Sequence, residues 1–181
     1  MTLLLVTYGV ARSETFKVGG IWYVTVDNNQ NVCGAPVQQN EANYSGSISV
    51  PGSVTYAGRD YAVTSIGKGA FSGATGMTSI AMDGSIGSIE DTAFQGCTGI
   101  TSVEIHQRTT FVGASAFEGC TKLGTVTLSS RLNTIKNRAF ANCTSLSRID
   151  VEARVTSIGD EAFLNCSRLS TTALPSGLKS I

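Results

Sequence analysis

Residues 112–128 read VGASAFEGCTKLGTVTL, and residues 135–151 read IKNRAFANCTSLSRIDV. The two stretches carry Ala-Phe, Cys and alternating apolar residues in the same order, and the second begins 23 residues after the first. Ala-Phe pairs begin at residues 70, 93, 116, 139 and 162, so this step is constant along the chain. A fixed period of this size predicts stacked supersecondary units, because one such unit cannot bury its own apolar face.

The repeat contains two strand signals and one turn signal. We number its 23 positions from the first apolar residue of the strand motif, so that Leu123 is position one. Positions one, four and six are apolar, as in Leu123, Val126 and Leu128, and position thirteen is apolar and β-branched in every repeat. Both patterns predict short strands. Position twenty is always Gly or Asn, which tolerate a positive φ, and predicts a one-turn helix around Ala-Phe that ends in a left-handed residue.

These positions resemble the BspA-like leucine-rich repeats, a 23-residue bacterial type with the pattern L-x-x-I-x-L-P-x-x-L-x-x-I-G-x-x-A-F-x-x-C. One repeat matches it at Ile158, Gly159, Ala162, Phe163 and Cys166. The resemblance implies a repeat solenoid, a right-handed superhelix of mainly short parallel β-strands with one-turn helices. We expect five repeats over residues 63–181, without a C-terminal cap.

The residues before the repeats predict a β-hairpin-rich cap over residues 14–62. Two apolar runs flank Gly19-Gly20, which is a hairpin signal. Further strands are expected at residues 32–38, 45–50 and 54–56. Phe16, Trp22 and Tyr23 are expected to cover the apolar end of the first coil, because a solenoid end needs such a cover.

The two ends of the chain carry separate expectations. Residues 1–13 are apolar and end in Ala11-Arg12-Ser13, which predicts a signal peptide; a first β-strand of the mature fold is the alternative. No basic residue precedes the apolar run, so the natural start is expected upstream. Ile181 occupies position thirteen of an incomplete coil, and self-association through that coil is expected.

Four of the five cysteines follow the period, at residues 97, 120, 143 and 166. Ala74 fills the same position in the first repeat, which favours small buried thiols over disulfides. No histidine shares the face of the repeat that carries these cysteines, so a metal site is not favoured. Cys33 has no evident partner.

The sequence offers little for catalysis or nucleic-acid binding. Thirteen basic and thirteen acidic residues cancel, which argues against a nucleic-acid partner. His106 is the single histidine, so neither a Ser-His-Asp triad nor a multi-histidine metal site is possible. No glycine-rich phosphate motif occurs. We therefore expect neither catalytic residues nor a cofactor.

One periodic feature is a candidate binding surface. Arg108, Arg131 and Arg154 occupy position nine of successive repeats and are expected to stack along one edge. They either form a basic strip for an acidic partner or a sulfated glycan, or they are an ordinary solvated edge. Glu104, Asp150 and Glu152 are their expected counter-charges. The full candidate surface adds outward residues of the strand motif: Arg108, Arg131, Arg154, Glu104, Thr127, Arg148 and Asp150.

The resemblance implies an exported or cell-surface bacterial protein. Such a protein binds other macromolecules, and we expect a protein or glycan partner on host matrix or on neighbouring cells. No membrane-spanning segment is expected in the mature chain. The alternative is a structural spacer within a larger surface protein, which the small polar residues on the outward strand positions favour.

Overall fold

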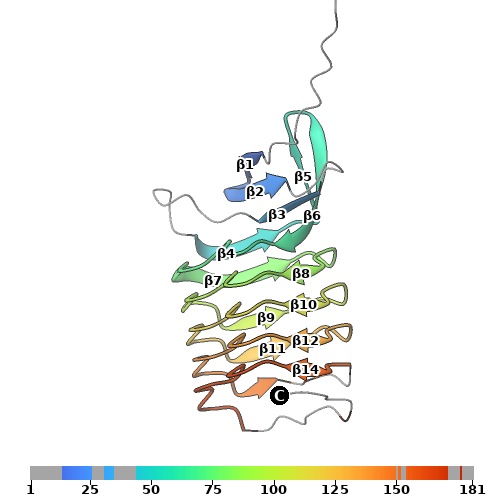
Figure 1. Cartoon of the computed structure of the whole chain (residues 1–181). Helices are drawn as coiled ribbons and strands as arrows, with labels where there is room; N and C mark the ends of the chain where they lie inside the picture. The colour runs from blue at the N-terminus through green and yellow to red at the C-terminus, as the bar shows by residue number, and fades with distance from the viewer. Residues whose placement is uncertain are drawn as a thin grey trace, which may run out of the picture.

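The computed structural model describes residues 14–25, 31–34, 44–149, 151, 154–170 and 176, and this part of the chain forms a stack of coils (Figure 1). The predicted signal peptide and the incomplete coil around Ile181 lie outside the described residues. The strands are β1 (Thr15–Val18), β2 (Ile21–Thr25), β3 (Asn31–Gly34), β4 (Ser45–Val50), β5 (Ser53–Tyr56), β6 (Arg59–Ile66), β7 (Gly76–Met82), β8 (Ser88–Ile89), β9 (Ser102–Glu104), β10 (Phe111–Val112), β11 (Thr125–Thr127), β12 (Thr134–Ile135), β13 (Arg148–Ile149) and β14 (Ser157–Ile158).

Each coil contributes one motif strand and one return strand. The return strands form one continuous parallel ladder, whereas β9, β11 and β13 form a second ladder and β7 pairs with β4 in a separate two-stranded sheet. The motif strands β7, β9, β11 and β13 lie around position four, and the return strands β6, β8, β10, β12 and β14 end at position thirteen. Equivalent residues pair across coils, for example Val126 with Ile149 and Ile135 with Ile158. Because the register equals the repeat, every inward side chain lies beside its counterparts in the coils before and after it. Both predicted strands of the repeat are confirmed.

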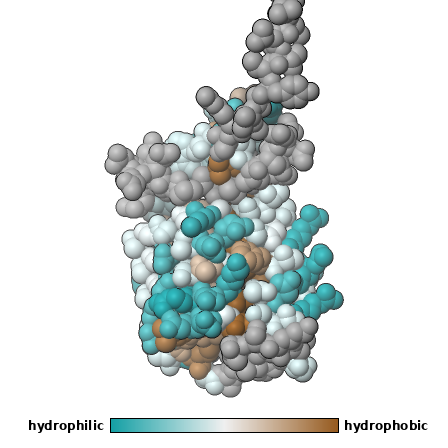
Figure 2. Space-filling model, in the orientation of Figure 1, coloured by the Kyte–Doolittle hydropathy of each residue, from teal (hydrophilic) through white to brown (hydrophobic). Residues whose placement is uncertain are grey.

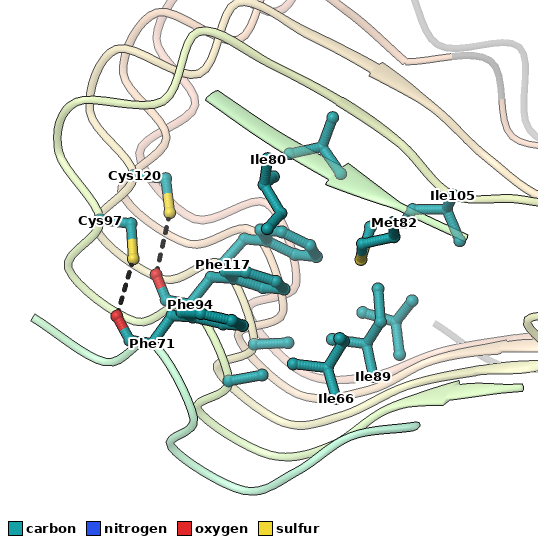
Figure 3. Packing of buried hydrophobic residues seen from close by; sticks show 14 of the residues in the cluster. Ile66, Phe71, Ile80, Met82, Ile89, Phe94, Cys97, Ile105, Phe117 and Cys120 are labelled. Atoms are coloured by element: carbon teal, nitrogen blue, oxygen red, sulfur yellow. Dashed lines mark hydrogen bonds between the residues drawn. The ribbon is translucent and has the colours of Figure 1, made fainter. Parts of the chain in front are cut away.

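The core between the two ladders is a stack of phenylalanines flanked by aliphatic side chains (Figure 3). The rings at position eighteen lie nearly parallel, with centroids 5.3 Å apart for Phe71–Phe94, 5.0 Å for Phe94–Phe117 and 5.3 Å for Phe117–Phe140. Phe94, Phe117 and Phe140 have no exposed surface. The alanine before each ring is also buried, which lets the backbones of successive coils approach closely.

The corner around Ala-Phe is a run of turns, and the one-turn helix expected there is wrong, since no helix forms within the described residues. Amides at positions seventeen, nineteen and twenty-one bond three residues back, as Ala139 N does to Lys136 O. The intervening amides bond to the next coil, as Phe140 N does to Ala162 O at 2.9 Å. Arg138 and Asn142 have φ of 58° and 60°, and such left-handed residues four apart prevent helical bonding.

The predicted left-handed residue at position twenty is confirmed in all five coils. A second left-handed residue at position sixteen was not expected, because only the first coil has Gly there. The members at position twenty are Gly73, Gly96, Gly119, Asn142 and Asn165, and those at position sixteen are Gly69, Thr92, Ser115, Arg138 and Glu161.

The N-terminal residues extend the ladder of return strands and supply a partner for β7. β1 and β2 form an antiparallel hairpin, β3 joins β6 in parallel, and β4 joins β7 in parallel (Figure 1). Phe16 and Tyr23 are buried, and the Phe16 ring stacks on that of Tyr56 at 4.3 Å. The ring that meets the phenylalanine stack is Tyr44, whose centroid lies 4.8 Å from that of Phe71. Trp22 is half-buried, with Lys17 Nζ 5.5 Å from its ring centroid.

Candidate binding surface

The outward face of the motif strands is small and polar. Val103 and Val126 point inward and are buried, so their neighbours Ser102, Thr125 and Thr127 are exposed on the opposite face. The strand register brings Glu104 beside Thr127, two of the predicted surface residues. It likewise brings Arg148 beside Thr125. This face therefore presents hydroxyl groups with a few charges and no large apolar anchor among its described residues. Asp150 lies outside the described residues.

The predicted arginines occupy one edge of the stack, in turns that connect motif strands to return strands. Arg108, Arg131 and Arg154 are all exposed. The turns are closed by equivalent backbone bonds, from Thr109 N to His106 O and from Leu132 N to Ser129 O, both at 3.0 Å. These equal turns hold Arg108 and Arg131 in register on successive coils. We call Arg108, Arg131 and Arg154 the arginine ladder.

Side chains at position seven reinforce these turns. The buried Ser129 accepts a bond from Arg131 N at 3.1 Å, and the Asp83 carboxylate accepts one from Ser85 N at 2.8 Å. These Ser85 hydrogen bonds lower the pKa of Asp83 below its usual range, with smaller contributions from the charges of His106 and Arg108. Of the ladder turns, the one that carries Arg131 is therefore fixed by both a backbone and a side-chain hydrogen bond, and the one that carries Arg108 by a backbone bond.

The predicted counter-charges do not neutralise the ladder where the structure describes them. Glu104 Oε1 lies 3.4 Å from Nδ1 of His106 on its own coil, a contact that is an ion pair only when His106 is protonated. In the described ranges, no carboxylate lies within 4 Å of any ladder guanidinium. Glu152, like Asp150, is outside those ranges. Figure 2 shows strongly hydrophilic side chains projecting from one edge of the stack.

The opposite corner carries an ion-pair network that sequence reasoning missed. Arg138 Nε donates to Glu118 Oε1 at 3.1 Å, and Arg138 also pairs with Glu161 on the next coil. Gln95 Nε2 donates to the other Glu118 oxygen at 3.2 Å. The hydrogen bond from Arg138 is the main reason that the pKa of Glu118 is lowered. The available signal was a pair of opposite charges, Arg138 and Glu161, one period apart.

The periodic thiols are free, as predicted, and each has a hydrogen-bond acceptor. Cys97 Sγ donates to Phe71 O at 3.0 Å, and Cys120 Sγ donates to Phe94 O at 3.2 Å (Figure 3). Burial raises the pKa of Cys97 to about 12, which keeps the thiol protonated and unreactive. Within the described part of the chain, no group of three His, Cys, Asp or Glu residues has a geometry that could hold a metal ion.

Among the described residues, no helix is long and apolar enough to cross a membrane. The charged contacts described above are the Glu104–His106 contact and the Arg138 network, and both lie at the surface.

Comparisons with known proteins agree with this architecture. The family model described as the BspA type leucine rich repeat region matches residues 63–181 in six copies. A T. pallidum leucine rich repeat protein, TpLRR, is similar in structure, with a TM-score of 0.78 and 21% identity over 91% of this chain and 73% of its own. No curated protein matches the chain.

Two larger proteins contain a similar fold. The pneumococcal vaccine antigen PcpA gives a TM-score of 0.62 and 21% identity over 93% of this chain and 50% of its own. A leucine rich cell surface protein from Faecalibacterium prausnitzii gives 0.53 and 21% over 88% of this chain and 54% of its own. The chain thus spans about half the length of these two proteins. Since the family model covers more than half of this chain, the protein belongs to the BspA-type leucine-rich repeat family.

Proposed function

We propose that this chain is a non-catalytic binding module, secreted by a bacterium or displayed on its surface, that contacts matrix proteins or other cells. Membership of the BspA-type family is the observation that carries the proposal. The structurally similar F. prausnitzii protein is a cell surface protein, which supports the location. The polar face of the motif strands supports contact through many weak hydrogen bonds, where several coils add avidity.

The test measures capture of a panel of extracellular matrix proteins and whole host cells by the immobilised chain. Thr125→Arg with Thr127→Arg places two long charged side chains on the motif-strand face and is expected to abolish capture. Ser72→Arg with Thr121→Arg adds the same charge at exposed sites on the turn corner and should leave capture intact. Equal loss in both variants would argue against a role for the motif-strand face.

A structural spacer is the second candidate. It is supported by the uniform bonding between coils, because the corner amides of each described repeat bond to the next coil. A spacer predicts that neither matrix proteins nor cells are captured, while the stack retains full resistance to proteolysis. That result would replace the binding proposal.

A further inference from the structure

The arginine ladder combines three features that an ordinary solvated edge does not need. Its side chains are exposed, the turns that carry Arg108 and Arg131 are closed by equivalent hydrogen bonds, and its members repeat on adjacent coils. Parallel neighbours in a sheet lie about 4.8 Å apart, so the three cations occupy successive levels of one edge. Like charges on successive levels repel one another, although water and salt screen exposed charges, so the cost to stability is small.

Nothing described near the ladder relieves that repulsion fully. Glu104 lies beside His106 and more than 4 Å from each ladder guanidinium, and the two glutamates that pair with Arg138 lie on the other corner. Asp83 lies near Arg108 only, at one end of the ladder, and its carboxylate already accepts the Ser85 amide. The geometry therefore leaves a row of cations with hydrogen-bonding capacity directed to solvent.

We infer that the arginine ladder binds a sulfated polysaccharide; this inference rests on the proposed binding function and names its ligand class. A linear polymer with an anionic group on each repeating unit offers charges in a row, as the ladder does. The guanidinium fork matches the oxygens of a sulfate in a two-point contact. The preformed turns mean that little backbone order is lost on binding.

The surroundings favour a sugar over an acidic protein segment. The adjoining motif-strand face offers hydroxyl groups, which suit a polyhydroxylated ligand. Protein interfaces concentrate their affinity in buried aromatic and apolar anchors. The described chain exposes only two large hydrophobic residues, and neither Tyr56 in β5 nor Leu164 at position nineteen belongs to the ladder turns.

The experiment compares binding of the full chain to immobilised dextran sulfate and to uncharged dextran. Wild type is expected to bind only dextran sulfate, and raised salt should weaken binding. Arg108→Gln, Arg131→Gln and Arg154→Gln together should reduce affinity at least tenfold. The matched control replaces Lys68, Lys122 and Lys136 by Gln, which removes three positive charges at exposed sites off the ladder, and should change affinity less than twofold.

Three results would overturn the inference: unchanged affinity of the arginine variant, equal loss in the lysine variant, or stronger binding to poly-glutamate than to dextran sulfate. The last would identify an acidic protein segment as the ligand class. Circular dichroism spectra and unfolding midpoints verify that each variant is folded. A chain that captures matrix proteins or cells but not dextran sulfate would refute the ladder alone, whereas capture of neither would refute the proposed function as well.

Discussion

Arg131 and Arg138 belong to the same coil, but the residues one period away carry charges of opposite sign in the two cases. Arg138 is followed by Glu161 at the same position, and Glu118 lies close enough to form a second pair. Arg131 lies between Arg108 and Arg154. One edge of the stack therefore uses its arginine to join coils, while the other lines up cations without a described partner. The difference shows that in a stacked repeat the residues on the neighbouring coils decide whether a charged side chain forms an ion pair between coils.

The two edges share one interior, and removing part of it should have the largest effect. Phe117→Ala is expected to lower the free energy of unfolding by about 3–5 kcal/mol, because a fully buried ring leaves a cavity between two others. Urea unfolding measures the loss. Leu164→Ala removes an exposed side chain at the same corner and should cost less than about 0.5 kcal/mol. Similar costs for the two variants would contradict a shared core.

The second largest effect is expected from acid, which should weaken the edge that carries the Glu118–Arg138 pair. The folded-state pKa of Glu118 is lowered, so the folded chain binds fewer protons than the unfolded chain in the window below the ordinary value of 4.5. The stabilisation is fully present above 4.5 and is lost as the pH falls through the lowered value. Urea midpoints measured down that window should fall less steeply for Glu118→Gln than for wild type.

Glu14→Gln is the control for the acid experiment, because Glu14 is an exposed carboxylate outside the Arg138 network. It should retain the pH dependence of wild type. If the two glutamine variants respond alike, the Glu118–Arg138 pair has no special share in acid stability.

A smaller gain is expected from relaxing one turn at the paired corner. Thr92 is β-branched and has a φ of 56°, a conformation that Asn adopts at lower cost. Thr92→Asn should raise the free energy of unfolding by roughly 0.5–1 kcal/mol. Thermal unfolding monitored by circular dichroism would measure the gain. Thr78→Asn, at an exposed strand position, controls for composition, and a gain there of equal size would count against relief of strain.

The smallest effect on stability is expected at the ladder itself. Replacing Arg108, Arg131 and Arg154 by Gln removes like charges from exposed turns and should change the free energy of unfolding by no more than about 0.5 kcal/mol. The triple lysine control should behave in the same way. A large loss for the arginine variant would mean that the ladder supports the turns, and the contrast between the two edges would then disappear.

The period made much of the interior predictable. Apolar residues at fixed positions located the motif and return strands, and Gly or Asn at position twenty predicted a left-handed residue. Ala74 in the place of the cysteines predicted free buried thiols. These inferences depend on local chemistry repeated in register, which a single sequence carries.

The corner and its charges were less predictable, because they depend on contacts between coils. Position sixteen is left-handed although Thr92 and Arg138 do not favour it, since every other corner amide must reach the next coil. The same bonding replaced the expected helix. Glu118 and Arg138 are 20 residues apart, so no single repeat position reveals their pairing. Glu104 was expected to be a counter-charge of the arginines, but its carboxylate lies 3.4 Å from His106 on the same coil.

The alternating amides of the corner have a consequence for how such chains change in length. The first four Ala-Phe corners donate from positions sixteen, eighteen and twenty to the following coil, as Thr92, Phe94 and Gly96 do. The backbone bonds of these junctions are therefore equivalent, and the direction of donation is the same along the stack. Duplication or excision of one whole unit would recreate the same backbone junction, so a gene encoding this stack can lengthen or shorten in complete turns, and only side-chain pairs such as Arg138–Glu161 depend on which unit is gained or lost.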